Sequence, residues 1–292
     1  MTPTTPKGVS IIIPVYNEEG AIEATIQSIR EVCTKARFTY ELLVVDDGST
    51  DGTRQTLSAA GIVPLQHDLN LGYGASIKTG IRHAQYDVIA IIDADGTYPA
   101  EKLPDMVAAM IGKTYDMVIG ARTGPQAHVP WMRRPGKWIL RRLAMAITGM
   151  DIPDLNSGLR VFRRELFERY ETMFPEGFSF TTTITMIALT NGYRVKFLPI
   201  NYHKRIGQSS IHPVRDFLGF LMLIVRLAVY FKPLKIFLPV SVVLFVIGSA
   251  KAVIDVVRLN HFGVGGVTVV LAALQLAFLG LLADLILHRT RL

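Results

Sequence analysis

The sequence contains a single cysteine, Cys33, among 292 residues. One cysteine cannot form a disulfide within the chain, so we exclude a disulfide-stapled module and expect a reducing compartment. Cys33 continues the apolar stripe of Ile22, Ile26 and Ile29. This spacing indicates a buried thiol rather than a nucleophile.

The sequence also lacks an apolar run near its start. Residues Met1 to Lys7 are polar and rich in proline, and a β-rich run follows directly. A secretory signal peptide needs an apolar core of about 7–15 residues, so we expect the N-terminal domain to stay in the cytoplasm.

Acidic residues are fewer than basic ones, 24 against 31, which gives a net charge of +7. A basic chain favours anionic partners such as a membrane surface, a nucleotide diphosphate or a nucleic acid. The sequence shows no recognisable nucleic-acid-binding motif, so nucleic acid is not the expected partner. Hydrophobic residues make up 50% of the chain, and the excess collects after about residue 213.

Strand and helix patterns alternate from residue 9 to about 120. The apolar, β-rich runs are 9–13, 41–45, 62–65, 88–92 and 117–119. The helical patterns between them are 20–33, 52–60, 74–85 and 101–112. This alternation predicts an α/β fold with a mostly parallel sheet, in which ligands bind beyond the carboxyl ends of the strands. Further helices are expected at 136–148, 164–173 and 179–191, and a further strand at 195–202.

The segment Asp93-Ala94-Asp95 ends the apolar run from Val88 to Ile92, which is typical of a buried strand. Two carboxylates at alternate positions share one side of an extended chain. Like charges so close are costly unless a cation lies between them, and Mg²⁺ or Mn²⁺ prefers oxygen ligands. The segment therefore predicts a site for a divalent metal and a diphosphate.

Polar clusters follow other strands as well. Tyr16-Asn17-Glu18 comes after the first, Asp46-Asp47-Gly48-Ser49 after the second, and Arg122 follows the fifth. Because the carboxyl ends of parallel strands meet at one edge of a sheet, we expect these residues to share one crevice with Asp93 and Asp95.

The C-terminal third contains two long apolar stretches, 236–257 and 264–287. About 22 helical residues span roughly 33 Å, enough for a bilayer core of about 30 Å. The turn between them is short, which predicts a transmembrane hairpin with both ends on the cytoplasmic side, where Lys and Arg flank it. Within the first span Lys251 and Asp255 are four residues apart and can pair. Residues 213–231 are expected to form a helix that lies on the membrane.

Several segments together resemble the family 2 glycosyltransferases with the GT-A fold, in the dolichyl-phosphate mannose synthase-like branch that acts on polyprenyl phosphates. The segments are Ser10–Glu19, Val44–Thr53, Asn70–Ala75, Asp93–Pro99, Asp154–Phe162 and Arg205–Ser209. The resemblance covers about residues 8–212, and the two terminal spans are similar to those of membrane-anchored members.

The resemblance implies a Rossmann-like GT-A domain over 1–212, an interfacial helix over 213–233 and a transmembrane hairpin over 234–292. It implies a metal-dependent hexosyltransferase that uses a nucleotide sugar of the GDP-mannose or UDP-glucose type. The acceptor would be a polyprenyl phosphate, dolichyl or undecaprenyl, at the cytoplasmic membrane face. Direct in-line attack would invert the anomeric configuration.

The resemblance also implies roles for individual residues. Nucleotide-sugar contacts are expected at Pro14, Tyr16, Glu18, Asp46, Asp47, Ala94 and Asp95. The metal, Mg²⁺ or Mn²⁺, is expected at Asp93 and Asp95, with Thr97 at a third ligand position where the family often has a better ligand. Lipid-phosphate contacts are expected at Arg122, Arg133, Arg134, Arg160, Lys204 and Ser209. Asp154 and Arg205 are the candidate catalytic residues. Arg205 would contact phosphate, and Asp154 would either orient the acceptor or act as a base.

The basic segments fit such an acceptor. A phosphate monoester is largely dianionic at pH 7, so it needs positive charge to dock rather than a general base. Residues 131–142 hold five basic residues and no acid, and 194–235 hold eight against one acid, Asp216.

Two alternatives remain open. A processive polysaccharide synthase of the same superfamily would carry a Gln-x-x-Arg-Trp motif and more spans, which the sequence lacks. A membrane-anchored binding protein without turnover would keep the fold, although Asp93, Asp95, Asp154 and Arg205 are all present.

Overall fold

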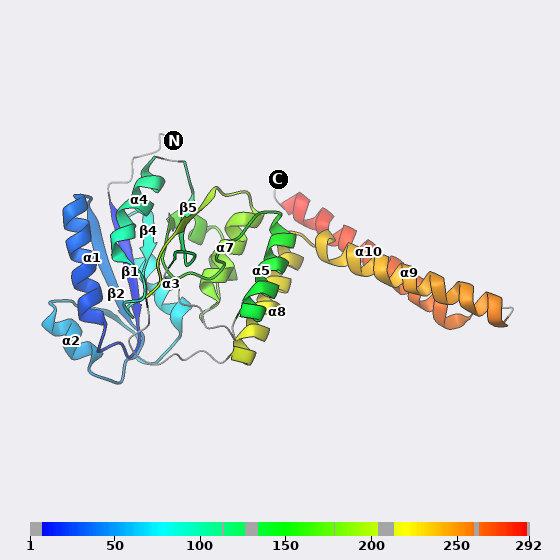
Figure 1. Cartoon of the computed structure of the whole chain (residues 1–292), viewed down its shortest axis with the longest axis horizontal. Helices are drawn as coiled ribbons and strands as arrows, with labels where there is room; N and C mark the ends of the chain where they lie inside the picture. Colours follow the sequence, from blue (N-terminus) through cyan, green and yellow to red (C-terminus); the bar gives the residue numbers. More distant parts are fainter. Residues whose placement is uncertain are drawn as a thin grey trace. The chain divides into compact units, whose positions relative to one another are not determined.

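The computed structural model describes residues 8–112, 114–125, 134–177, 179–203, 213–259 and 263–290. The chain divides into two compact units, Met1–Phe220 and Leu221–Leu292. The first unit carries the sheet, and the second carries the two long apolar helices (Figure 1).

The described part of the first unit contains a seven-stranded sheet in the order β3-β2-β1-β4-β6-β5-β7. The strands are β1 Val9–Val15, β2 Tyr40–Asp46, β3 Leu65–Gln66, β4 Val88–Ile91, β5 Met117–Ala121, β6 Arg160–Arg163 and β7 Val195–Pro199. All pair in parallel except β6, which runs antiparallel to both β4 and β5. The predicted α/β fold with a mostly parallel sheet is confirmed.

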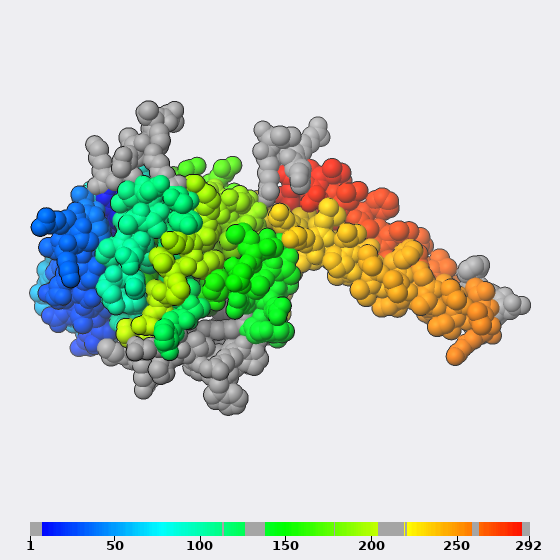
Figure 2. Space-filling view, turned by 45° about the horizontal axis from the view of Figure 1, so that its top comes forward, coloured from blue at the N-terminus to red at the C-terminus, as the bar shows by residue number. Residues whose placement is uncertain are grey.

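Helices flank the sheet and connect its strands. In the first unit they are α1 Ile22–Ala36, α2 Thr53–Ala59, α3 Tyr73–His83, α4 Leu103–Ile111, α5 Arg134–Thr148, α6 Arg164–Glu168 and α7 Phe180–Thr190. Short 3₁₀ turns lie at Ala100–Lys102 and Glu171–Met173, and α8 covers Pro213–Phe231. Figure 2 shows α1, in blue, beside α4, in blue-green, on the surface of this unit.

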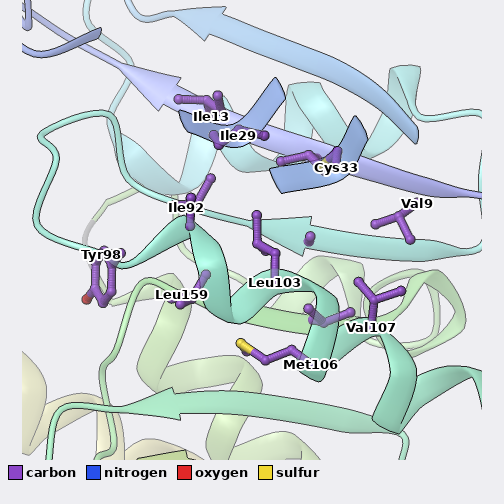
Figure 3. Packing of buried hydrophobic residues seen from close by; sticks show 14 of the residues in the cluster. Val9, Ile13, Ile29, Cys33, Ile92, Tyr98, Leu103, Met106, Val107 and Leu159 are labelled. Atoms are coloured by element: carbon purple, nitrogen blue, oxygen red, sulfur yellow. The ribbon is translucent and has the colours of Figure 1, made fainter. Parts of the chain in front are cut away.

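The inner strand β1 is buried along its whole length, so side chains from both of its faces enter the core. On one face Val9 and Ile13 pack with Ile29 and Cys33 of α1 and with α4 (Figure 3). On the other face Gly80 of α3 lies against Ile12, so closely that an added Cβ would stand 2.6 Å from its Cγ2. The predicted burial of Cys33 is confirmed.

Three local predictions differ from the structure. The strand β6 was not expected, because four residues with arginine at both ends, Arg160–Arg163, do not resemble a buried strand. The strand expected at 62–65 is the two-residue β3 at Leu65–Gln66. The helix expected at 164–173 ends at Glu168, and a separate 3₁₀ turn follows.

The second unit contains the helix pair α9 Leu234–Leu259 and α10 Val264–Thr290, which pack side by side (Figure 2). Stretches of 25 and 24 residues in these helices are long and apolar enough to cross a membrane. Small residues allow the close approach that is usual between membrane helices. A Cβ on Gly248 would lie 2.9 Å from the Val270 nitrogen. The predicted pairing of Lys251 with Asp255 is confirmed, at 3.2 Å.

Candidate active site

A cavity of about 250 Å³ lies at the carboxyl ends of β1, β2 and β4. The loops after these strands and the first turn of α3 form its walls. Its lining residues are Pro14, Val15, Tyr16, Glu18, Asp47, Asn70, Tyr73, Ser76, Asp93, Ala94 and Asp95. The structure therefore brings most of the residues predicted for the nucleotide sugar and the metal to one cavity.

Asp95 is held by the turn that follows β4. Its Oδ1 accepts hydrogen bonds from the Thr97 backbone N–H at 3.1 Å and from the Thr97 hydroxyl at 2.6 Å. Thr97 itself is fully buried and does not line the cavity. This geometry differs from the expectation of a third ligand, because the Thr97 hydroxyl orients Asp95 instead.

Asp93 lies between two segments that are distant in sequence. The Tyr73 hydroxyl donates to Asp93 Oδ1 at 2.8 Å. On the other side, a Cβ added to Gly158 would stand 2.5 Å from Asp93 Oδ2, so a larger residue there would displace the carboxylate. Burial, followed by the neighbouring Asp93, raises the pKa of Tyr73 well above its usual value, which keeps the phenol a donor.

The segment after β1 carries Tyr16 and Glu18. Tyr16 is 43% exposed at the cavity, so its ring offers a face on which a base can stack. Asn17 between them has φ 56, a left-handed conformation that asparagine tolerates. The Glu18 N–H donates to Thr53 Oγ1 at 2.9 Å, which fixes the segment against the start of α2.

Asp46 does not occupy the position predicted for a nucleotide contact. It is fully buried and is not among the residues that line the cavity. Its carboxylate accepts a hydrogen bond from Arg54 Nε at 2.6 Å and one from the Ser49 N–H at 3.0 Å. These two donors make Asp46 a support of the loop that follows β2.

Asp47 lines the cavity, but its carboxylate also holds a neighbouring loop. It accepts hydrogen bonds from the N–H groups of Leu71 and Gly72, at 2.9 and 2.8 Å. His67 Nδ1 lies 2.7 Å from its Oδ1. The predicted nucleotide-sugar contact of Asp47 thus competes with three partners of its own chain, which fix the entry to α3.

Arg122 and Asp154 form a two-pronged ion pair at the end of β5. Arg122 Nε and Nη2 donate to the two Asp154 oxygens at 2.7 and 2.8 Å, and the Arg122 N–H adds a third bond at 3.0 Å. Burial disfavours the charged form, yet the pKa of Arg122 lies well above its usual value because Tyr98 and Asp154 are beside it. The guanidinium also lies over the Tyr202 ring, 5.3 Å from its centre.

Arg160 differs most from its prediction as a phosphate contact. Its side chain is fully buried, and it donates to the carbonyl oxygens of Ser157 and Thr181. Burial lowers the pKa of Arg160 to about 10, so it stays charged at neutral pH. A buried guanidinium bound to backbone carbonyls cannot reach a lipid phosphate, so Arg160 is a structural support of the segment before β6.

Five other predicted residues cannot be placed in this way. Arg133, Lys204, Arg205 and Ser209 lie outside the described residues. Arg134 begins α5, and only its backbone is described.

Pro14 and Ala94 line the cavity as predicted, and the Ala94 carbonyl accepts a hydrogen bond from the Thr25 hydroxyl at 3.0 Å.

No role was predicted for four residues that line the cavity, Val15, Asn70, Tyr73 and Ser76. Tyr73 and Ser76 are three residues apart, which places both on one face of the expected helix. This spacing of two polar residues directly after Gly72 is the sequence pattern that could have placed both at the cavity. Tyr98 was also missed, and its hydroxyl accepts the Gly158 N–H at 2.7 Å.

A divalent cation fits the acidic side of the cavity. Asp93 and Asp95 both line it, and neighbouring carboxylates favour a cation between them. Among the described residues no group of three or more His, Cys, Asp or Glu forms a complete metal cage. Such a site suits Mg²⁺ or Mn²⁺, which binds through one or two carboxylates and completes its coordination with substrate phosphates.

A comparison with known families decides the identity. The model described as "Glycosyl transferase family 2" matches residues 10–171, more than half of the chain. The chain belongs to glycosyl transferase family 2. A second model, "GtrB C-terminal hairpin", matches residues 232–288 of this family 2 glycosyltransferase, the region of α9 and α10. The resemblance read from the motifs is confirmed, and the chain is a membrane-anchored enzyme.

Named relatives share most of the chain. Glycosyltransferase AglJ of Haloferax volcanii is 30% identical to this family 2 glycosyltransferase over 302 residues, covering 99% of this chain and 97% of AglJ. The undecaprenyl-phosphate 4-deoxy-4-formamido-L-arabinose transferase of Enterobacter sp. (strain 638) is 30% identical over 262 residues, covering 87% of this chain and 77% of that protein.

A solved structure shares the fold. Glucosyl-3-phosphoglycerate synthase from Mycobacterium tuberculosis, in complex with Mn²⁺, uridine diphosphate and phosphoglyceric acid, superimposes with a TM-score of 0.60. The sequences are 19% identical, and the match covers 76% of this chain and 78% of that one. The expected GT-A fold is thereby confirmed.

Proposed function

We propose that this glycosyltransferase transfers a hexose from a nucleotide sugar to a polyprenyl phosphate, such as dolichyl or undecaprenyl phosphate. The observation that carries the proposal is the presence in one chain of an acidic cavity at the strand ends and a helix pair apolar enough to cross a bilayer. The first suits a nucleotide diphosphate with its cation, and the second keeps the enzyme where a lipid acceptor is found. The name of the Enterobacter relative, a transferase acting on undecaprenyl phosphate, supports this acceptor class.

The donor would lie in the cavity, with its base on the Tyr16 ring and Glu18 beside the ribose. Asp93 and Asp95 would hold Mg²⁺ or Mn²⁺. The bound ion would neutralise the diphosphate and stabilise the departing nucleoside diphosphate as a Lewis acid. Thr97 keeps Asp95 in a fixed orientation for this purpose.

The acceptor phosphate would meet positive charge from Arg122, with Arg133, Arg134, Lys204, Arg205 and Ser209 as further proposed contacts. Both Asp154 oxygens accept from the Arg122 guanidinium. A carboxylate paired in this way is a weak base, and the phosphate dianion needs none. We therefore assign Asp154 to orienting Arg122.

In the reaction a phosphate oxygen of the lipid forms a bond to the anomeric carbon while the bond from that carbon to the donor diphosphate breaks. The bonding electrons leave with the nucleoside diphosphate. In-line displacement inverts the configuration, so an α-linked donor should give a β-linked lipid product. Proton NMR of the isolated product measures the linkage, and a retained α-linkage would contradict direct displacement.

The catalytic unit would face the cytoplasm. Two spans return the chain to its starting side; Lys232 precedes the first span, and Lys235 lies at its start. Protection of cysteines introduced into exposed loops of the first unit, measured in sealed cells, tests this orientation.

The transfer assay uses membranes that contain the full chain, a panel of labelled GDP and UDP sugars, Mg²⁺ or Mn²⁺, and a polyprenyl phosphate. Label should move to the organic phase for one donor. Asp95→Asn and EDTA should each abolish the transfer, whereas the exposed-site variant Glu101→Gln, at a residue outside the cavity lining, should not. Turnover at wild-type rate in EDTA, or no label in lipid with any donor, would overturn the proposal.

A further inference from the structure

The two oxygens of Asp93, a predicted metal ligand, each lie against a different, distant part of the described chain. Tyr73, the first residue of α3, donates its hydroxyl to Oδ1 at 2.8 Å. The backbone of Gly158 stands so close to Oδ2 that an added Cβ would lie 2.5 Å away. The carboxylate is thus confined on both sides.

The Tyr73 side of this arrangement is rigid because the start of α3 is tied to two other segments. The Gly72 N–H donates to Asp47 Oδ2 at 2.8 Å. The Ala75 N–H donates to the Glu176 carbonyl at 2.9 Å. Backbone bonds on either side of Tyr73 therefore hold its backbone in place, and from there its hydroxyl reaches Asp93.

The Gly158 side is fixed as well. Its N–H donates to the Tyr98 hydroxyl at 2.7 Å. The neighbouring Ser157 hydroxyl donates to the Gly120 carbonyl in β5 at 2.6 Å. Asp154, which pairs with Arg122, belongs to the same segment. The segment that lies against Asp93 therefore also orients Arg122, the arginine proposed to contact the acceptor phosphate.

We propose that Tyr73 is a positioning residue of the metal site: its hydroxyl holds the Asp93 carboxylate, against the Gly158 backbone, in the orientation that the donor diphosphate and its cation require. The inference rests on the proposed function, since it assigns Asp93 to that cation. Groups that orient a metal ligand through a hydrogen bond typically contribute about 10- to 100-fold to metal affinity. Removing the Tyr73 hydroxyl alone should therefore weaken metal-dependent nucleotide binding without loss of the fold.

Two variants disturb Asp93 from opposite sides. Tyr73→Phe removes the donor to Oδ1, and Gly158→Ala pushes a methyl group against Oδ2. Two matched controls make the same chemical changes elsewhere. Tyr115→Phe is the control for the lost hydroxyl. Tyr115 precedes β5, at the end of the strands opposite the cavity, and its ring lies against Lys196. Gly112→Ala has an ordinary φ of −63 and no atom nearer than 3.7 Å to its new methyl group.

The measurement is binding of Mn²⁺ to the purified full-length chain in the presence of UDP and, separately, of GDP. The free-ion signal in electron paramagnetic resonance reports the unbound Mn²⁺. We expect Tyr73→Phe and Gly158→Ala to bind Mn²⁺ about 10- to 100-fold more weakly with the preferred nucleotide. Both controls should bind as the wild type does, and thermal melts should show all four variants folded at the assay temperature.

Wild-type Mn²⁺ binding by Tyr73→Phe would overturn the inference. So would weak binding in Tyr73→Phe that is matched by Tyr115→Phe. A wild-type chain that binds Mn²⁺ with neither nucleotide would overturn this inference and the proposed function together. Another outcome separates the two proposals. If Tyr73→Phe and Gly158→Ala both bind Mn²⁺ more weakly, but the wild-type chain transfers no sugar to polyprenyl phosphate, the role of Tyr73 is supported and only the proposed acceptor is contradicted.

Discussion

Removing one partner of the Arg122–Asp154 pair should destabilise the first unit more than removing both. The two side chains are 12% and 10% exposed, and they share bonds of 2.7 and 2.8 Å. Truncating one partner of a buried pair costs about 3–5 kcal/mol, because the other charge stays buried without its counter-ion. In a domain of this size each kcal/mol lowers the melting temperature by about 2–4 °C. Asp154→Ala should therefore lower it by roughly 6–20 °C.

The assay is thermal melting of the purified full-length chain in detergent. It compares Asp154→Ala, Arg122→Met and the double variant Arg122→Met with Asp154→Leu. The double variant should melt at a higher temperature than either single variant, because it leaves no charge buried without its counter-ion. Arg141→Ala is the control, since its pair with Asp151 is exposed and should contribute at most about 1 kcal/mol. Single variants within about 2 °C of the wild type, less than 1 kcal/mol, would refute the reasoning.

Two further predictions concern buried groups of the first unit. Burial raises the pKa of the Cys33 thiol to about 12 from an ordinary 9.0. A thiol reagent at pH 8 should therefore label Cys33 only after unfolding, and rapid labelling of the folded chain would contradict its burial. The free energy of unfolding should also decline as the pH rises above 9.0, because the thiol ionises first in the unfolded chain. Arg160→Met should leave the Ser157 and Thr181 carbonyls without their donor, at a cost of about 1–3 kcal/mol each, and a melting temperature equal to that of the wild type would show that Arg160 is not a structural support.

The sequence predicted the layout of the site because that layout depends on strand direction. Apolar runs that end in polar residues place Glu18, Asp93 and Asp95 at one edge of a parallel sheet, and this follows from periodicity alone. The antiparallel strand β6 could not be predicted in the same way. It has four residues and pairs with strands distant in sequence, so no local pattern marks it.

Individual roles were less predictable than positions. An arginine such as Arg160 is usually exposed, so its burial depends on carbonyl partners that only the folded chain supplies. The adjacent acids Asp46 and Asp47 look alike in sequence, yet one is buried against Arg54 and the other lines the cavity. The contact between Tyr73 and Asp93 joins a helix start to a strand end, which spacing does not encode.

If the proposed function holds, the order of the strands separates a donor half of the enzyme from an acceptor half. The residues that line the cavity all fall between Pro14 and Asp95, whereas Arg122 and Asp154 come later in the chain. The two halves meet where β6 lies between β4 and β5. A chimera that joins residues up to about the end of α4 with the later residues of a relative would thus exchange the acceptor while leaving the nucleotide unchanged, provided that glycine is kept at 158.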